Sequence, residues 1–139
     1  MAAAGPRPIG RPPEGNAGAF RELTFAHRIV LGSAGAISSQ DPAKDSKVVA
    51  VKTATKTGRY TLTLSGGRKF RQFRGGDCSI VGLTDAIYGA NTTGYGFHWR
   101  NDLLSTAGTV ELQFTRNTDN ADAEVPDNFV LMIRLVVKV

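Results

Sequence analysis

The last eleven residues of the chain, 129–139, form an almost unbroken apolar segment that reads Phe-Val-Leu-Met-Ile-Arg-Leu-Val-Val-Lys-Val. Its many β-branched residues favour a β-strand. Successive side chains of a strand point to opposite faces, and here both faces carry apolar groups. A strand of this kind must be covered on both sides. This requirement constrains the fold more than any other feature of the sequence.

The alternation of a strand divides this segment into two sets of side chains. One set is wholly apolar and is expected to face the core: Phe129, Leu131, Ile133, Leu135 and Val137. The other set places Val130, Met132 and Val136 beside Arg134 and Lys138. This second set needs another sheet, an arm or another subunit to cover it. We therefore expect Val130 and Met132 to contact a partner.

The length and composition are those of one soluble domain. The chain has 139 residues, and a hydrophobic content of 41% is too high for global disorder. No apolar run approaches the roughly 18 residues that a membrane-spanning helix needs. The first residues lack the apolar core of a secretory signal, so we expect synthesis in a cytosol and no membrane contact.

Residues 1–19 differ in composition from the rest of the chain. They contain four glycines, four prolines and five alanines, and their only cationic residues are Arg7 and Arg11. Proline-rich segments favour extended conformations, and this one has too little apolar surface to form a core. We therefore predict an extended arm at 1–19 followed by a β-sandwich domain at 20–139, with Arg7 and Arg11 available for interactions.

Short apolar or alternating segments separated by turns predict eight strands. No segment keeps a helical period over ten residues. Eight antiparallel strands form most simply a two-sheet β-sandwich of jelly-roll-like type, or a small barrel as the alternative. The expected strands are 23–31, 48–52, 58–64, 68–74, 77–83, 94–100, 109–115 and 129–139. Two of them, 58–64 and 109–115, alternate clearly, and the side chains expected to point inward are Tyr60, Leu62, Leu64, Val110, Leu112 and Phe114.

No pattern of residues indicates catalysis, a cofactor or a metal site. The two histidines, His27 and His98, both lie within expected strands and are interpreted as structural. The single cysteine, Cys78, excludes an internal disulfide and is interpreted as a small buried hydrophobe. The acidic segment 119–127 does not match the spacing of an EF-hand loop and is interpreted as solvated. The chain is therefore predicted not to be an enzyme.

Charge is unevenly distributed along the chain, which carries a net charge of +5. Nine basic residues and a single acidic one lie between 44 and 74, whereas residues 102–127 contain six acidic residues and only Arg116 as a base. Such an arrangement suits docking against copies of the same chain or against a surface of mixed charge. Two solvated sets of loops of opposite sign are the alternative.

The strongest candidate for an interaction surface is a basic hairpin. Residues 65–67, Ser-Gly-Gly, predict a hairpin turn into the strand 68–74. That strand carries Arg68, Lys69, Arg71 and Arg74, interleaved with Phe70 and Phe73. Basic side chains with exposed aromatic rings suit single-stranded nucleic acid, whereas arginines also bind protein carboxylates. Protein docking and a plain solvated edge with core phenylalanines are the two favoured interpretations, and nucleic-acid contact is less favoured than either.

Several phrases of the sequence resemble small virion structural proteins of tailed bacteriophages, in particular head decoration or cement proteins. These are the Gly/Pro/Ala/Arg arm, Gly-Arg-Tyr-Thr-Leu-Thr-Leu at 58–64, Gly-Thr-Val-Glu-Leu-Gln-Phe at 108–114, and Asp-Ala-Glu-Val-Pro-Asp at 122–127 before the apolar terminal strand. The likeness spans most of residues 20–139 and rests on layout and on common strand residues.

The resemblance implies a non-enzymatic protein on the outer capsid surface of a virion. Such proteins bridge neighbouring major capsid subunits and often act as homodimers or homotrimers, so the implied partners are the major capsid protein and the chain itself. The resemblance brings no active-site residue and no cofactor. Alternatives are another virion component, such as a tail, fibre-base or coat protein, and a small nucleic-acid-binding β-barrel.

Overall fold

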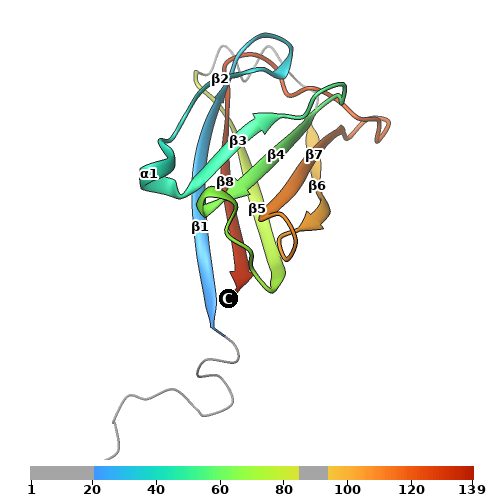
Figure 1. Ribbon diagram of the computed structural model, residues 1–139. Helices are drawn as coiled ribbons and strands as arrows, with labels where there is room; N and C mark the ends of the chain where they lie inside the picture. The colour runs from blue at the N-terminus through green and yellow to red at the C-terminus, as the bar shows by residue number, and fades with distance from the viewer. Residues whose placement is uncertain (1–20, 85–93) are drawn as a thin grey trace, which may run out of the picture.

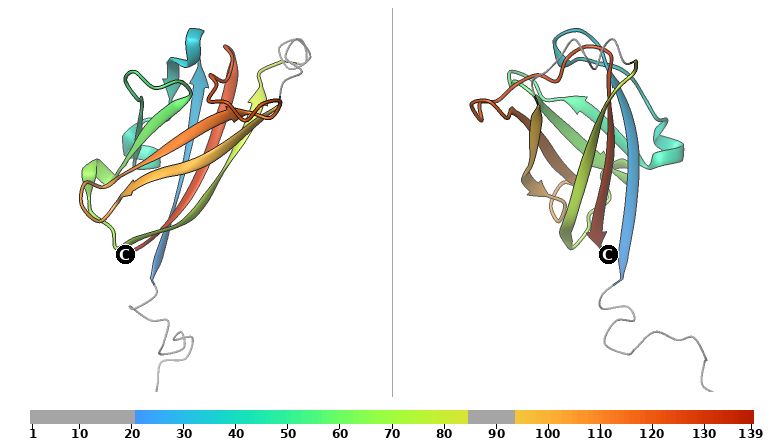
Figure 2. Two further views of the ribbon diagram at one scale, coloured as in Figure 1. Left: turned by 90° about the vertical axis from the view of Figure 1, so that its right-hand side faces the viewer. Right: turned by 180° about the vertical axis from the view of Figure 1, so that it is seen from behind.

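The computed structural model describes residues 21–84 and 94–139, which form two facing layers of β-strands (Figures 1 and 2). The eight-stranded antiparallel β-sandwich expected from the sequence is confirmed. A one-turn helix α1 (Ala43–Ser46) and two short 3₁₀ turns, η1 (Ser33–Gly35) and η2 (Ser65–Gly67), lie between strands. The strands are β1 (Glu22–Leu31), β2 (Ile37–Gln40), β3 (Val48–Lys52), β4 (Arg59–Leu64), β5 (Gln72–Gly82), β6 (Tyr95–Leu103), β7 (Thr109–Arg116) and β8 (Phe129–Lys138).

The first sheet has the order β2-β1-β8-β5, and β8 pairs along its length with β1 on one side and β5 on the other. The apolar face predicted for β8 is the core face, because all of its members are buried: Phe129, Leu131, Ile133, Leu135 and Val137. Burying a side chain of this size stabilises the fold by roughly 1.5–3 kcal/mol. The C-terminal segment is thus an inner strand of its sheet.

The second sheet has the order β3-β4-β7-β6 and supplies the other half of the core. The alternation predicted for β4 and β7 holds, since every second side chain points inward and is fully buried: Tyr60, Leu62, Leu64, Val110, Leu112 and Phe114. The rings of Tyr60 and Phe114 meet edge to face with their centroids 5.9 Å apart. Such a contact adds to the stabilisation from burial alone.

The hairpin predicted at residues 65–67 is wrong. β4 already pairs with β3 on one side and β7 on the other, so no edge of β4 remains for residues 68–74. The η2 turn instead carries the chain across to the first sheet, where β5 starts at Gln72 and runs without a break to Gly82. Gly75 does not end the strand, because its positive φ of 121° accommodates a register shift opposite β8.

β2 was missed by the sequence analysis. It has four residues, Ile-Ser-Ser-Gln, with one apolar side chain among them, and it pairs only with the last part of β1. So short and polar a segment carries no periodic signal, and its position is fixed by pairing with β1. One helix is described, and no helix of the described residues is long and apolar enough to cross a membrane.

Gln40, the last residue of β2, joins the two sheets on one side of the sandwich. Its amide nitrogen donates to the carbonyl of Ala50 at 2.9 Å, and its Oε1 accepts from the Ala50 N–H at 2.9 Å. The side chain therefore completes both backbone bonds of one residue on the free edge of β3. His27 is 3% exposed and forms hydrogen bonds with both ring nitrogens. Its Nε2 lies 2.8 Å from Gln40 Oε1, and its Nδ1 lies 2.7 Å from Ser46 Oγ. Because Oε1 can only accept, Nε2 carries the proton of this pair.

On the opposite side the sandwich is closed by Trp99 of β6, which packs on Gly76 of β5. A Cβ atom on Gly76 would lie 2.8 Å from the indole ring, so only glycine allows the ring to approach the backbone so closely. The ring of Phe73 also contacts Trp99, with a centroid distance of 5.1 Å. The indole Nε1 is buried and has no hydrogen-bond partner among the described residues.

Replacing Gln40 with Leu should destabilise the domain by about 3 kcal/mol or more, because it leaves the N–H and C=O of Ala50 and the His27 ring nitrogen without partners. Chemical denaturation followed by circular dichroism measures this change. The control is Ser39→Ala, which alters an exposed neighbour on the same strand. Equal denaturation midpoints for the two variants would show that Gln40 does not contribute to the contact between the two sheets.

Candidate functional site: the basic end of the sandwich

The basic residues singled out from the sequence lie within residues 68–74, where the chain crosses from the second sheet and enters β5 of the first. We call residues 68–74 the crossing segment. Backbone hydrogen bonds hold this crossing segment in place: Phe70 N donates to Leu104 O at 2.9 Å, and Arg71 N donates to Lys138 O at 2.9 Å. The side chains of this set are exposed, and the structure brings all four to the same end of the sandwich: Arg68, Lys69, Arg71 and Arg74.

Two further cations join them that the sequence analysis missed. Lys138 lies opposite Glu22 of β1 and Gln72 of β5 in the strand register, and Val139 N donates to Arg21 O at 3.0 Å. The sequence gives no signal for this, since residues 21, 72 and 138 meet only through the pairing of β1 and β5 with β8. We call the following set the basic end: Arg21, Arg68, Lys69, Arg71, Arg74 and Lys138.

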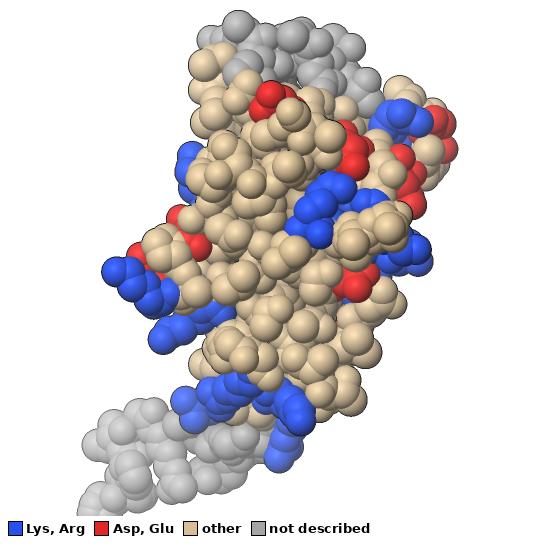
Figure 3. All heavy atoms as spheres, turned by 45° about the horizontal axis from the view of Figure 1, so that its top comes forward, with Lys and Arg blue, Asp and Glu red and all other residues tan. Residues whose placement is uncertain are grey.

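Few carboxylates oppose the basic end. Glu22 accepts from Arg74 Nε at 3.1 Å, and both side chains are more than two-fifths exposed, so this pair contributes little to stability. Asp102 caps the N–H of Leu104 nearby at 3.2 Å. Figure 3 shows blue basic atoms gathered at this end of the molecule, whereas red and blue atoms are interspersed elsewhere on the visible face. The basic end therefore carries a net positive charge.

The two phenylalanines of the crossing segment turn inward. Phe70 is 3% exposed and meets Phe25 edge to face at 5.7 Å. Phe73 is half-buried against Trp99. The guanidinium of Arg68 lies over the ring of Phe70, 5.2 Å from its centroid, which orients this cation at the surface. Within residues 21–84 and 94–139, the basic end thus presents cations without exposed aromatic rings for base stacking.

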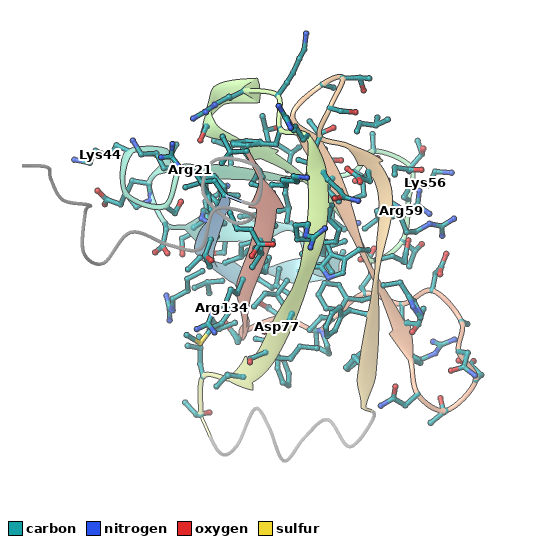
Figure 4. All side chains as sticks on the ribbon, turned by 90° about the horizontal axis from the view of Figure 1, so that it is seen from below. Arg21, Lys44, Lys56, Arg59, Asp77 and Arg134 are labelled. Atoms are coloured by element: carbon teal, nitrogen blue, oxygen red, sulfur yellow. The ribbon has the colours of Figure 1, made fainter. Side chains whose placement is uncertain are left out.

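The second apolar face of β8 is only partly available to a partner. Val130 is 3% exposed, with Val30 of β1 and Val81 of β5 as its register partners. Met132 is 49% exposed and borders a hollow of about 320 Å³ on the outer face of the first sheet. The wall of that hollow carries charges of both signs: Arg28, Asp41, Asp77 and Arg134. Asp77 and Arg134 lie opposite each other on paired strands, as Figure 4 shows.

The acidic half of the sequence does not form an opposite pole. Glu111 accepts from Arg59 at 3.4 Å, and Glu124 accepts from Lys52 at 3.0 Å. Asp119 accepts two hydrogen bonds from Arg116, and this hydrogen bonding holds the pKa of Asp119 below its ordinary value. Glu124 also accepts from Gly58 N at 2.7 Å, so it fastens the β7–β8 loop to the β3–β4 loop.

The remaining titratable groups have structural positions. His27 has hydrogen-bond partners at both ring nitrogens, as expected of a structural histidine, and His98 is exposed on the outer face of β6. Tyr60 donates to Gly35 O at 2.5 Å, and burial raises its pKa above the ordinary value, with Glu124 adding to the effect. No group of three metal-ligand side chains occurs within residues 21–84 and 94–139. Arg7 and Arg11 lie outside the described residues.

Cys78 packs against the core from β5 as a small apolar side chain, but it is partly buried and not fully buried as expected. Burial raises the pKa of its thiol to about 12, with the charge of Asp77 as the second cause. A thiol with so high a pKa stays protonated at neutral pH and is a poor nucleophile.

The free energy of unfolding should fall as the pH rises above about 8.5, where the thiol of an unfolded chain ionises. Between that value and the folded-state pKa of about 12 the folded chain binds the extra proton, so each pH unit lowers stability by up to roughly 1.4 kcal/mol. Urea denaturation at a series of pH values up to about 9.5, below the ordinary range of tyrosine, measures the slope. Cys78→Ala should flatten it, and parallel profiles for the two proteins would contradict the assignment.

Comparison of the chain with known protein families, with curated proteins and with solved structures found no match in any of the three.

Proposed function

We propose that this chain is a non-enzymatic virion structural protein that binds the outside of a bacteriophage capsid and stabilises it by bridging capsid subunits. The observation that carries the proposal is the basic end, where cations from three separate chain segments converge on a rigid frame. In this proposal the protein is made in the host cytoplasm and resides on the capsid surface. Its partners are the major capsid protein and other copies of the chain.

The geometry of the basic end favours binding to a protein surface. Arginines form paired hydrogen bonds with carboxylates, and three of the six cations, Arg68, Arg71 and Arg74, are arginines from the crossing segment alone. Backbone bonds from Phe70 and Arg71 fix that segment, so little conformational freedom is lost when it docks. A positively charged patch also steers the protein toward acidic surfaces.

Nucleic acid is the less favoured partner because of the aromatic residues. Single-stranded binding surfaces combine cations with exposed rings on which bases stack. Phe70 is buried and Phe73 is half-buried, so neither ring is presented beside the cations.

Bridging requires contacts with more than one subunit. The arm at residues 1–19 leads into β1, and an extended segment of 19 residues spans up to about 60 Å. The domain would bind one subunit by its basic end while the arm, with Arg7 and Arg11, reaches a neighbour. Stability then comes from the summed interface area over many copies, in which each contact is modest.

The double charge reversal Lys69→Glu with Arg71→Glu should lower capsid binding by about two orders of magnitude, as expected when favourable charge pairs become repulsive. Co-sedimentation with particles that lack this protein measures the effect. The control is Lys56→Glu, an exposed reversal in the β3–β4 loop. Similar binding of both variants would exclude the basic end as the docking surface.

Deleting residues 1–19 should leave the sandwich folded and weaken capsid binding, because the arm would supply the second contact. Thermal denaturation checks the fold and co-sedimentation checks the binding. Undiminished binding of a folded, truncated chain would remove the arm from the proposal.

Another virion component of the same build is the main alternative, and locating the chain in images of purified particles separates head from tail. A nucleic-acid-binding role would instead show as oligonucleotide affinity that falls steeply with salt.

A further inference from the structure

The first half of β1 has a free edge. β8 pairs with β1 from Glu22 to Val30, whereas β2 pairs on the other side only with Ile29, Val30 and Leu31. Past Gln40 the chain leaves the sheet and turns into α1, as Figure 1 shows. The position beside residues 22–26 of β1 is therefore not filled by any of the described strands.

The backbone groups on this edge can be assigned from the hydrogen bonds at both ends of β1. Arg28 O accepts from Asp41 N at 3.0 Å, and Arg28 N donates to Asp41 Oδ2 at 3.1 Å, so residue 28 faces the β2 side. Arg21 O accepts from Val139 N, so residue 21 faces β8. Because successive residues of a strand alternate, Thr24 and Ala26 face the β2 side. Within residues 21–84 and 94–139 no hydrogen bond to the N–H or C=O of these two residues is found.

A groove of about 770 Å³ runs beside this edge. Residues 23–26 of β1 form one wall, and the other wall comes from the second sheet and its connections: Ala43, Asp45, Ser46, Lys47, Val49, Ser65, Gly66 and Arg68. Thr24 and Ala26 are exposed. The groove thus combines an open strand edge with room for side chains on the far side.

The charges around the groove are mainly positive. Arg68 and Lys47 line it, with Asp45 as the acidic member of the lining. Arg68 is oriented by its contact with the Phe70 ring. Figure 4 shows Arg21 and Lys44 on the same side of the molecule as α1. A segment that enters the groove is therefore favoured if its own side chains are acidic.

We propose that the groove binds an extended acidic peptide segment of a partner protein, which adds as a strand to the free edge of β1. Its backbone pairs with Thr24 and Ala26, in the sheet position that β2 leaves after Gln40. Its carboxylates pair with Arg68 and Lys47. Strand addition of this kind takes affinity from main-chain bonds and specificity from the side-chain contacts. A nucleic acid has no peptide backbone that could add to this edge as a strand.

The probe is a fluorescein-labelled, blocked octapeptide of alternating glutamate and valine, and binding to the full chain is followed by fluorescence anisotropy. Ala26→Pro removes the outward N–H and places a ring in the groove, while leaving the bonds to β8 in place. We expect it to weaken binding at least about tenfold, as the loss of one or two hydrogen bonds implies. The matched control, Ala26→Ser, keeps the N–H and should bind within about twofold of the wild type, since a surface change of this kind has little effect.

Amide hydrogen exchange measured by NMR gives a second readout that needs no variant. The amides of Thr24 and Ala26 should exchange fast in the free protein and at least about tenfold more slowly with the peptide bound, whereas those of Phe25 and His27 are slow in both states.

Five outcomes would overturn the proposal. Equal binding of Ala26→Pro and wild type excludes strand addition, and equal binding of a lysine–valine octapeptide or tighter binding of oligothymidylate excludes an acidic peptide as the ligand. Slow exchange of Thr24 and Ala26 in the free protein would show that the chain's own residues 1–20 fill the edge. Protection that depends on protein concentration would show that a second copy fills it.

Discussion

The pairing of β8 on both of its edges is the interaction on which the rest of the structure depends. β1 and β5 are far apart in the sequence and belong to one sheet because they pair with opposite edges of β8. The same strand supplies five buried side chains to the core. Its position also assembles the basic end, because Arg21, Arg71 and Lys138 come together through the ladders on either side of it. One strand thus determines the sheet order, much of the core and the placement of surface charge.

The layer architecture could be predicted because it depends on alternation, which is local. The inward sets of β4, β7 and β8 follow from the sequence alone, and the structure agrees with them residue by residue. The path between the layers could not be predicted in this way. Residues 65–67 look like a hairpin turn, yet both edges of β4 are taken by β3 and β7, and this competition is invisible in a local pattern. β2 was missed for a related reason, since its four mostly polar residues form a strand because they pair with β1.

The candidate site shows the same division. The exposed cations of the crossing segment were predicted, but Arg21 and Lys138 were not, because they join through strand register. The uneven charge of the sequence also does not produce a basic pole and an acidic pole, because some residues of the two charged segments pair with each other. Glu111 and Glu124 lie beside Arg59 and Lys52, so two of the six acidic residues are paired with the earlier part of the basic segment. The cations that the fold gathers are the smaller set of the basic end, where Glu22 pairs with Arg74. Val130 illustrates a further limit, since an apolar residue on an outer face can be buried by its neighbours on the sheet.

Trp99 is the sole tryptophan of the chain, and it stands where the two layers touch, on β6 against Gly76 and Phe73 of β5. Its indole nitrogen is enclosed and lacks a partner among the described residues. The tryptophan emission of this protein therefore comes from one partly buried position at the contact between the layers. Heating, denaturant or a ligand that separates the two sheets would expose the indole to more water and shift its emission to longer wavelength. Trp99 is therefore an intrinsic fluorescence probe of the contact between the two sheets.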